Sequence, residues 1–112
     1  MALYYDITKV KTLWEQKSED IATLLDSLFD FIVEIKTLVK DKDYKTSEVI
    51  IDHIIHLTDR LGIDFAHDEA LLIKRWNESQ GKRKEIEITL KSMVSHTKNA
   101  IKEIRKDFSI LN

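Results

Sequence analysis

The sequence has 112 residues, of which 43% are hydrophobic and 34% are charged, with two glycines and neither proline nor cysteine. This composition excludes a disordered, collagen-like or disulfide-stabilised chain, and the length is enough for a single helical domain over residues 1–112. The formal net charge of −2 indicates neither a nucleic-acid-binding protein nor an acidic tail. No apolar run is long enough for a signal peptide or a membrane span, so we expect a cytoplasmic protein.

The first predicted element is an amphipathic helix over residues 3–17. Its apolar residues recur at helical spacing at Leu3, Ile7, Val10 and Trp14. The apolar pattern is interrupted at residues 17 and 18, where Ser18 could act as an N-cap. Because no glycine or proline enforces a break there, we expect a continuous or gently bent helix of about 34 residues.

The second part of that helix, from Ile21 to Val39, is the most apolar stretch and should lie at the centre of the fold. Its apolar stripe is wide enough to need more than one neighbouring helix to cover it. The next helix is expected to be capped by Asp43 or Thr46 and to end at Gly62, because glycine readily takes the left-handed conformation of a helix C-cap.

A third helix is expected to follow with Asp64 as its N-cap, and Gly81 should end it as Gly62 ends the helix before. The last helix carries an apolar face from Ile86 to Phe108. Short connections make successive helices antiparallel neighbours, so the predicted fold is an all-α, antiparallel four-helix up-down bundle with an N-terminal helical extension. The alternative is a three-helix bundle whose middle helix is broken at Gly62.

The helix before Gly62 carries possible metal ligands about one turn apart: Glu48, Asp52, His56 and Asp59. Carboxylates and imidazoles on successive turns can share a divalent ion. These residues lie opposite the apolar stripe, however, where a solvated charged face is expected. We therefore assign no metal, cofactor or catalytic residue from the sequence, and metal binding by this face is left open.

Residues 57–64, LTDRLGID, together with Glu48 and Asp52, resemble part of the all-helical, magnesium-dependent nucleotide pyrophosphohydrolases of the MazG type. The resemblance implies acidic pairs on two helices that hold magnesium, which activates water against a triphosphate. The preceding helix lacks the Glu-x-x-Glu pair of that family, and Asp52 lies about one turn closer to Asp64 than expected. Such an enzyme is the alternative function.

The last helix has a row of basic residues that recur every seven positions beside the apolar stripe: Lys84, Lys91, Lys98 and Arg105. Residues 81–112 hold 8 lysines and arginines against 4 acidic residues, whereas residues 1–80 hold 10 against 16. The basic row could follow nucleic-acid phosphates, which is the second alternative function. Acidic residues interleave with the row and no exposed aromatic side chain lies among them, so we favour a solvated flank or pairing with the acidic helices.

The N-terminal helix carries the aromatic residues Tyr4, Tyr5 and Trp14. Exposed apolar surfaces with tyrosine and tryptophan are typical of protein interfaces. This surface either contacts another molecule, most simply in a symmetric homodimer, or packs on the end of the last helix around Phe108, Ile110 and Leu111.

From these observations we predict a non-enzymatic protein–protein interaction module, such as a small regulator, inhibitor or immunity-type protein, with no membrane partner. The lysine-rich and isoleucine-rich composition is typical of an AT-rich bacterial, archaeal or viral genome. The predicted partner-binding residues are Tyr4, Tyr5, Trp14, Lys84, Lys91, Lys98 and Arg105.

Overall fold

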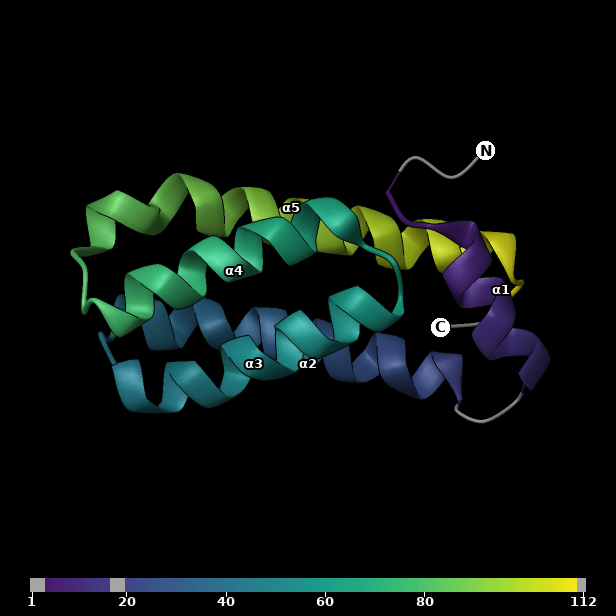
Figure 1. Ribbon diagram of the computed structural model, residues 1–112, viewed down its shortest axis with the longest axis horizontal. Coiled ribbons are helices and arrows are strands. Elements are labelled where there is room, and N and C mark those ends of the chain that lie inside the picture. The colour runs from purple at the N-terminus through teal and green to yellow at the C-terminus, as the bar shows by residue number, and fades with distance from the viewer. Residues whose placement is uncertain (1–3, 17–19, 111–112) are drawn as a thin grey trace.

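The computed structural model describes residues 4–16 and 20–110, which form five α-helices and no strand. The helices are α1 (Ile7–Gln16), α2 (Ile21–Lys40), α3 (Tyr44–Arg60), α4 (Asp64–Glu78) and α5 (Arg83–Asp107). The four longer helices extend along the molecule, and α1 lies across one end (Figure 1). The prediction of an all-α structure is confirmed.

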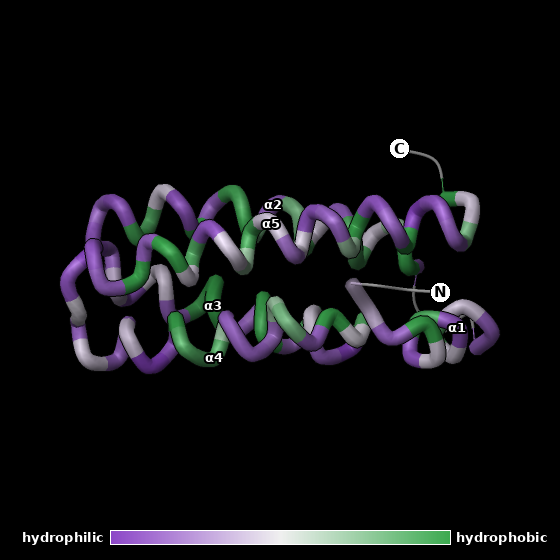
Figure 2. The backbone as a smooth tube through the Cα atoms, turned by 90° about the horizontal axis from the view of Figure 1, so that it is seen from above, coloured by the Kyte–Doolittle hydropathy of each residue, from purple (hydrophilic) through white to green (hydrophobic). Residues whose placement is uncertain are grey.

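The four longer helices enclose one hydrophobic core. α2 packs against α3 and α5, and α4 packs against the same two helices. In Figure 2, α2 and α5 form one layer and α3 and α4 form the other. The side chains of Leu28, Ile54, Ile73 and Met93, one from each helix, are almost completely buried. Since α3 and α4 pack side by side, they are not the two halves of one broken helix.

The expected continuous helix from the N-terminal segment into α2 is wrong. Asp20 has an extended backbone, with φ −81° and ψ 107°, and its carboxylate accepts 3.0 Å hydrogen bonds from the Ala22 N–H and the Thr23 hydroxyl. A capping carboxylate bonds the free N–H groups at the start of a helix, which a continuous helix would not have. The alternative cap, Ser18, lies outside the described residues.

The α2–α3 and α3–α4 turns largely follow the expected chemistry. The carboxylate of Asp43 accepts a 3.1 Å hydrogen bond from the Thr46 N–H and so caps α3 as predicted. Gly62 ends the turn after α3 with the expected positive φ of 68°. Asp64 was expected as the N-cap of α4, but Ile63 holds that position and Asp64 is the first helical residue. Only residues 61–63 separate the two helices, so the chain is already helical at Asp64, and no side chain caps α4.

The turn after α4 differs from its prediction. The positive φ lies at Gln80, with φ 52°, and not at Gly81. Gly81 is required by packing instead, because a Cβ at this position would collide with the indole of Trp76. That indole donates a 2.9 Å hydrogen bond to the Lys82 carbonyl, and the Tyr44 hydroxyl donates a 2.8 Å bond to the Gly81 carbonyl. The aromatic side chains therefore close this end of the molecule.

No helix within residues 4–16 and 20–110 combines the length and apolar character needed to cross a membrane.

Candidate functional site

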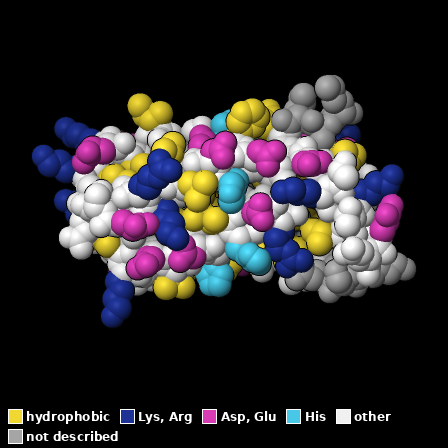
Figure 3. Space-filling view, viewed as in Figure 1, with side chains coloured by type: hydrophobic (Ala, Val, Ile, Leu, Met, Phe, Trp, Pro, Cys, Tyr) yellow, Lys and Arg dark blue, Asp and Glu magenta, His cyan; other side chains and the backbone are white. Residues whose placement is uncertain are grey.

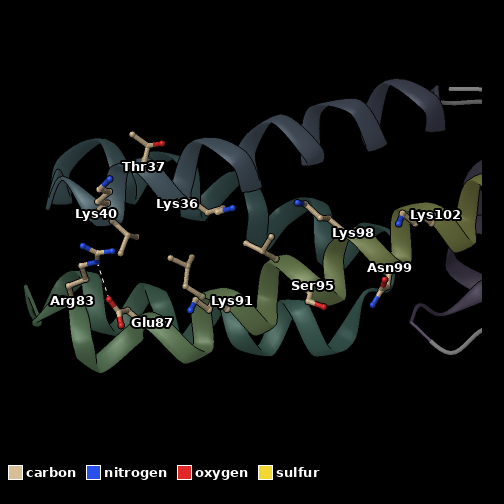
Figure 4. A pocket seen from close by; sticks show the side chains of 13 residues that line it. Lys36, Thr37, Lys40, Arg83, Glu87, Lys91, Ser95, Lys98, Asn99 and Lys102 are labelled. Carbon is tan, nitrogen blue, oxygen red and sulfur yellow. Dashed lines mark ion pairs between the residues drawn. The ribbon is translucent and has the colours of Figure 1, made fainter.

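A groove of about 640 Å³ lies between α2 and α5. Among the four longer helices, this neighbouring pair has the loosest contact, and no turn joins the two helices directly. The groove follows this looser seam along the bundle, and side chains reach it from both helices (Figure 4). It is therefore an open hollow on the surface of one helical layer.

The floor of the groove is apolar. It is formed by Val39 of α2 and by Leu90 and Val94 of α5, of which only 2–9% is exposed. Val39 lies on the core stripe of α2, whereas Leu90 and Val94 follow one another by one helical turn on α5. A ligand in this groove would contact the small exposed part of these side chains together with the methylene chains of the lysines around them.

The rim of the groove is strongly basic. Six cations line it, and the only lining carboxylate is that of Glu87, which lies 3.1 Å from the Arg83 Nε. Lys36 and Lys40 lie one turn apart on α2, so both reach the same side. From α5 come Arg83, Lys91, Lys98 and Lys102 (Figure 4). The groove thus concentrates positive charge in a chain whose formal net charge is −2.

Four of these cations have no ion-pair partner among the residues that the structure describes. Within the described part of the chain, no acidic side chain forms an ion pair with Lys36, Lys40, Lys91 or Lys102. Like charges that face each other across a groove repel, and an anion between them removes that repulsion. The rim is therefore arranged to attract a negatively charged ligand.

A second hollow of about 540 Å³ continues from the groove toward α1. Lys98 and Lys102 line both hollows, and the Lys98 Nζ lies 5.9 Å from the centre of the Phe29 ring, a cation–π contact. At its far end the Arg105 Nη2 donates a 2.5 Å hydrogen bond to the Asp26 carboxylate. This bond joins α5 to α2 and limits the seam at that end.

The four residues of the predicted basic row lie in different surroundings. Lys91 and Lys98 line the groove, while Arg105 is bonded to Asp26 and so pairs with an acidic helix as expected. Lys84 is exposed but lines neither hollow. Sequence reasoning missed Lys36 and Lys40, because a spacing along α5 carries no information about the helix that faces it. It also left out Arg83 and Lys102, which do not follow the seven-residue repeat.

The aromatic residues of the N-terminal segment contact the end of α5. The Tyr5 side chain is buried, and its hydroxyl donates a 2.8 Å hydrogen bond to Asp107. The Tyr4 N–H donates a hydrogen bond to the Glu103 carboxylate. The centres of the Trp14 and Phe108 rings are 5.5 Å apart. Packing around Phe108 is one of the two arrangements expected from the sequence. Leu111, which was expected to take part, lies outside the described residues. About half of Trp14 is exposed, and contact with a partner stays a prediction.

The acidic face of α3 does not form a ligand cluster. The Asp52 carboxylate lies 3.0 Å from the Lys74 Nζ and raises the pKa of that lysine through their hydrogen bond. Asp59 pairs with Lys9 at 3.6 Å. On the face formed by α3 and α4, acidic, basic and histidine side chains are interspersed (Figure 3). In the ranges that the structure describes, no three acidic or histidine side chains are placed to hold a metal ion.

No family model, curated protein or solved structure matches the chain. The geometry and charge of the groove are therefore the observations that indicate a function.

Proposed function

We propose that the chain is a non-enzymatic interaction module that binds a partner protein through the groove between α2 and α5. One observation carries the proposal: six cations surround a buried apolar floor on one side of a chain that is acidic overall. Protein interfaces combine an apolar centre with a polar, solvent-accessible rim, and the groove has that arrangement. A small regulator, inhibitor or immunity-type protein would act by such binding.

The proposal includes the topology of an antiparallel four-helix up-down bundle, with α1 as an N-terminal extension. It is supported by the short connections at residues 41–43, 61–63 and 79–82 and by the ring of contacts from α2 through α3 and α4 to α5. In this topology α2 and α5 are the first and last helices of the ring. No turn joins these two helices directly, so no loop crosses the groove along their seam.

Nucleic acid is the second candidate, because the unpaired lysines would also attract phosphates. The apolar floor favours a protein over this ligand, since a sugar–phosphate backbone has little apolar surface to place on Val39, Leu90 and Val94. Among the described residues that line either hollow, Phe29 of the second hollow is the one aromatic side chain, and Lys98 lies over its ring. Base stacking therefore has little support here.

The nucleotide pyrophosphohydrolase alternative has weaker support than either binding function. Its acidic residues would have to converge on magnesium, whereas Asp52 and Asp59 pair with lysines of two different helices, Lys74 of α4 and Lys9 of α1. Magnesium-dependent release of pyrophosphate from nucleoside triphosphates is the direct assay for this alternative.

Selection from a displayed peptide library tests partner-protein binding without knowledge of the partner. The selected peptides are compared on a groove variant, Lys91→Glu with Lys98→Glu, and on a control variant, Lys11→Glu with Lys45→Glu. Both variants change the net charge equally, but Lys11 and Lys45 are exposed lysines outside the groove. We expect peptides that bind the parent and the control variant and lose binding to the groove variant.

Two results of the selection would contradict the proposal. The first is a failure to enrich any peptide over the unselected library. The second is enrichment of peptides that bind the groove variant as tightly as the parent, because their binding surface would then lie elsewhere.

A further inference from the structure

We infer that the segment bound in this groove is an acidic amphipathic helix of the partner, lying lengthwise between α2 and α5. The inference rests on the proposed function and specifies the chemistry of the partner. It follows from the shape of the groove, the placement of its charges and the side-chain character of its walls.

The groove is long and its walls are helical. Its lining on α5 extends from Arg83 to Lys102, which corresponds to about 28 Å at 1.5 Å per residue, or about five turns. On α2 the groove is lined from Lys36 to Lys40, about one turn, and the second hollow continues that wall to Phe29 and Asp26. A third helix can lie along two others by placing its side chains between theirs, which is the recurrent helix-in-groove mode of peptide recognition.

The walls also favour a helix over an extended segment. Both walls belong to helices, whose backbone N–H and C=O groups are already bonded within α2 and α5. They offer no open sheet edge to an incoming strand, so an extended peptide would have no ladder of backbone partners. A helix satisfies its own backbone groups and presents only side chains to the groove.

The charges lie in two rows on either side of the floor. On α2, Lys36 and Lys40 are one turn apart; on α5, Lys91 and Lys98 are two turns apart and Lys98 and Lys102 one turn. A matching helix has an apolar stripe for the floor and carboxylates on both sides of that stripe. In heptad terms, apolar residues occupy positions a and d and acidic residues occupy e and g.

Lys98 is expected to be the central contact. It lines both hollows and lies over the exposed ring of Phe29. A carboxylate of the bound helix would attract its ammonium group away from Phe29. The ring, of which 42% is exposed, would then be available to apolar side chains of the partner. The bound helix would in this way extend from the groove into the second hollow.

A synthetic peptide of three heptads, about 21 residues, tests the inference, with leucine at a and d and glutamate at e and g. Repulsion between its glutamates disfavours pairing of the peptide with itself. We expect binding to the parent protein with a gain of helical circular dichroism. The groove variant should bind about tenfold more weakly or worse, and the control variant within about twofold of the parent.

Two matched peptides control for pattern and charge. One has the same composition in an order that places leucine and glutamate on no common face, and the other has glutamine in place of glutamate. We expect both to bind at least about tenfold more weakly than the designed peptide, because each lacks one half of the complementarity. Equal binding by either peptide would overturn the inference.

Other occupants of the groove give different results. A single-stranded oligonucleotide or anionic vesicles that bind more tightly than the peptide, and lose binding on the groove variant, would assign the groove to phosphate groups. A dimer of the parent that becomes a monomer in the groove variant would assign it to a second copy of this chain. If library peptides require the groove but show no acidic helical pattern, partner binding stands and the helical occupant is wrong.

Discussion

The phenol of Tyr5 is held in a neutral form at the end of the molecule where α1 lies. Burial and the hydrogen bond to the nearby Asp107 carboxylate raise the pKa of Tyr5 well above its usual value of about 10. Both effects favour the neutral phenol, the first because burial penalises the anion and the second because Asp107 can accept the phenol proton in a hydrogen bond but repels a phenolate. The contact between residue 5 and α5 therefore depends on a protonated side chain.

Alkaline pH should weaken the fold through this residue. In the unfolded chain Tyr5 loses its proton at about pH 10, while the folded chain retains it, so the free energy of unfolding falls as the pH rises above about 10. Urea denaturation at pH 8 and pH 10.5 measures the change. We expect Tyr5→Phe to reduce this pH dependence, because phenylalanine keeps the ring and has no proton to lose.

Tyr44→Phe is the matched control for that experiment. Its hydroxyl bonds the Gly81 carbonyl at the other end of the bundle, so the variant should lose stability yet keep the pH dependence that Tyr5 causes. An unchanged pH dependence in Tyr5→Phe would show that Tyr5 ionises alike in the folded and unfolded chains.

At the scale of single elements, the break between α1 and α2 determines which parts of the bundle the N-terminal segment contacts. The Asp6 N–H donates a 2.8 Å hydrogen bond to the Gly62 carbonyl, and the Lys9 Nζ contacts Asp59. α1 thus packs on the turn between α3 and α4 as well as on α5. A continuous helix would have carried these residues past the end of the bundle.

Asp20→Ala should lower the free energy of unfolding by about 1 kcal/mol, because it removes the side-chain cap of α2. Asp30→Ala is the control, since Asp30 is an exposed acidic residue in the middle of the same helix. We expect its effect to stay within about 0.5 kcal/mol. Chemical denaturation of both variants measures the difference, and equal stabilities would argue that Asp20 does not begin a helix.

The position of the α1–α2 boundary could not be read from apolar spacing. The pattern is weak over only two residues there, and neither glycine nor proline marks the end of α1. The boundary depends on contacts with Gly62, Asp59 and Phe108, which are distant in sequence. By contrast, Asp43 and Gly62 act through their own side-chain and backbone chemistry, so the sequence was enough to predict their roles.

At the scale of the whole molecule, the centre of α2 lies inside the hydrophobic core. Leu25, Leu28, Ile32 and Ile35 are all completely buried, as the wide apolar stripe of this segment predicts. The same helix supplies Phe29 and Val33, which are 42% and 48% exposed, together with Lys36 and Lys40. One face of α2 therefore packs in the core of the bundle. Lys36 and Lys40, on the adjoining edge of the helix, line the groove.

Leu28→Ala should cost about 2 to 5 kcal/mol of unfolding free energy, because it leaves a cavity among side chains from several helices. Val33→Ala is the control on the same helix, and its partly exposed side chain should cost less than about 1 kcal/mol. Urea denaturation distinguishes the two. A loss in Leu28→Ala no larger than in Val33→Ala would contradict a bundle packed around the centre of α2.

By itself, the sequence determined the all-α class, the central place of α2, the cap at Asp43 and the turn at Gly62, because each depends on spacing or chemistry within a few neighbouring residues. It also pointed to Lys91 and Lys98 through their repeat along one helix. Only the tertiary structure brought Lys36 and Lys40 opposite them and placed Trp76 against Gly81. The first arrangement depends on which helices pack together and in what register, because residues 50 or more positions apart meet only when the core has formed. The second depends on how the turn between α4 and α5 folds back on the Trp76 indole.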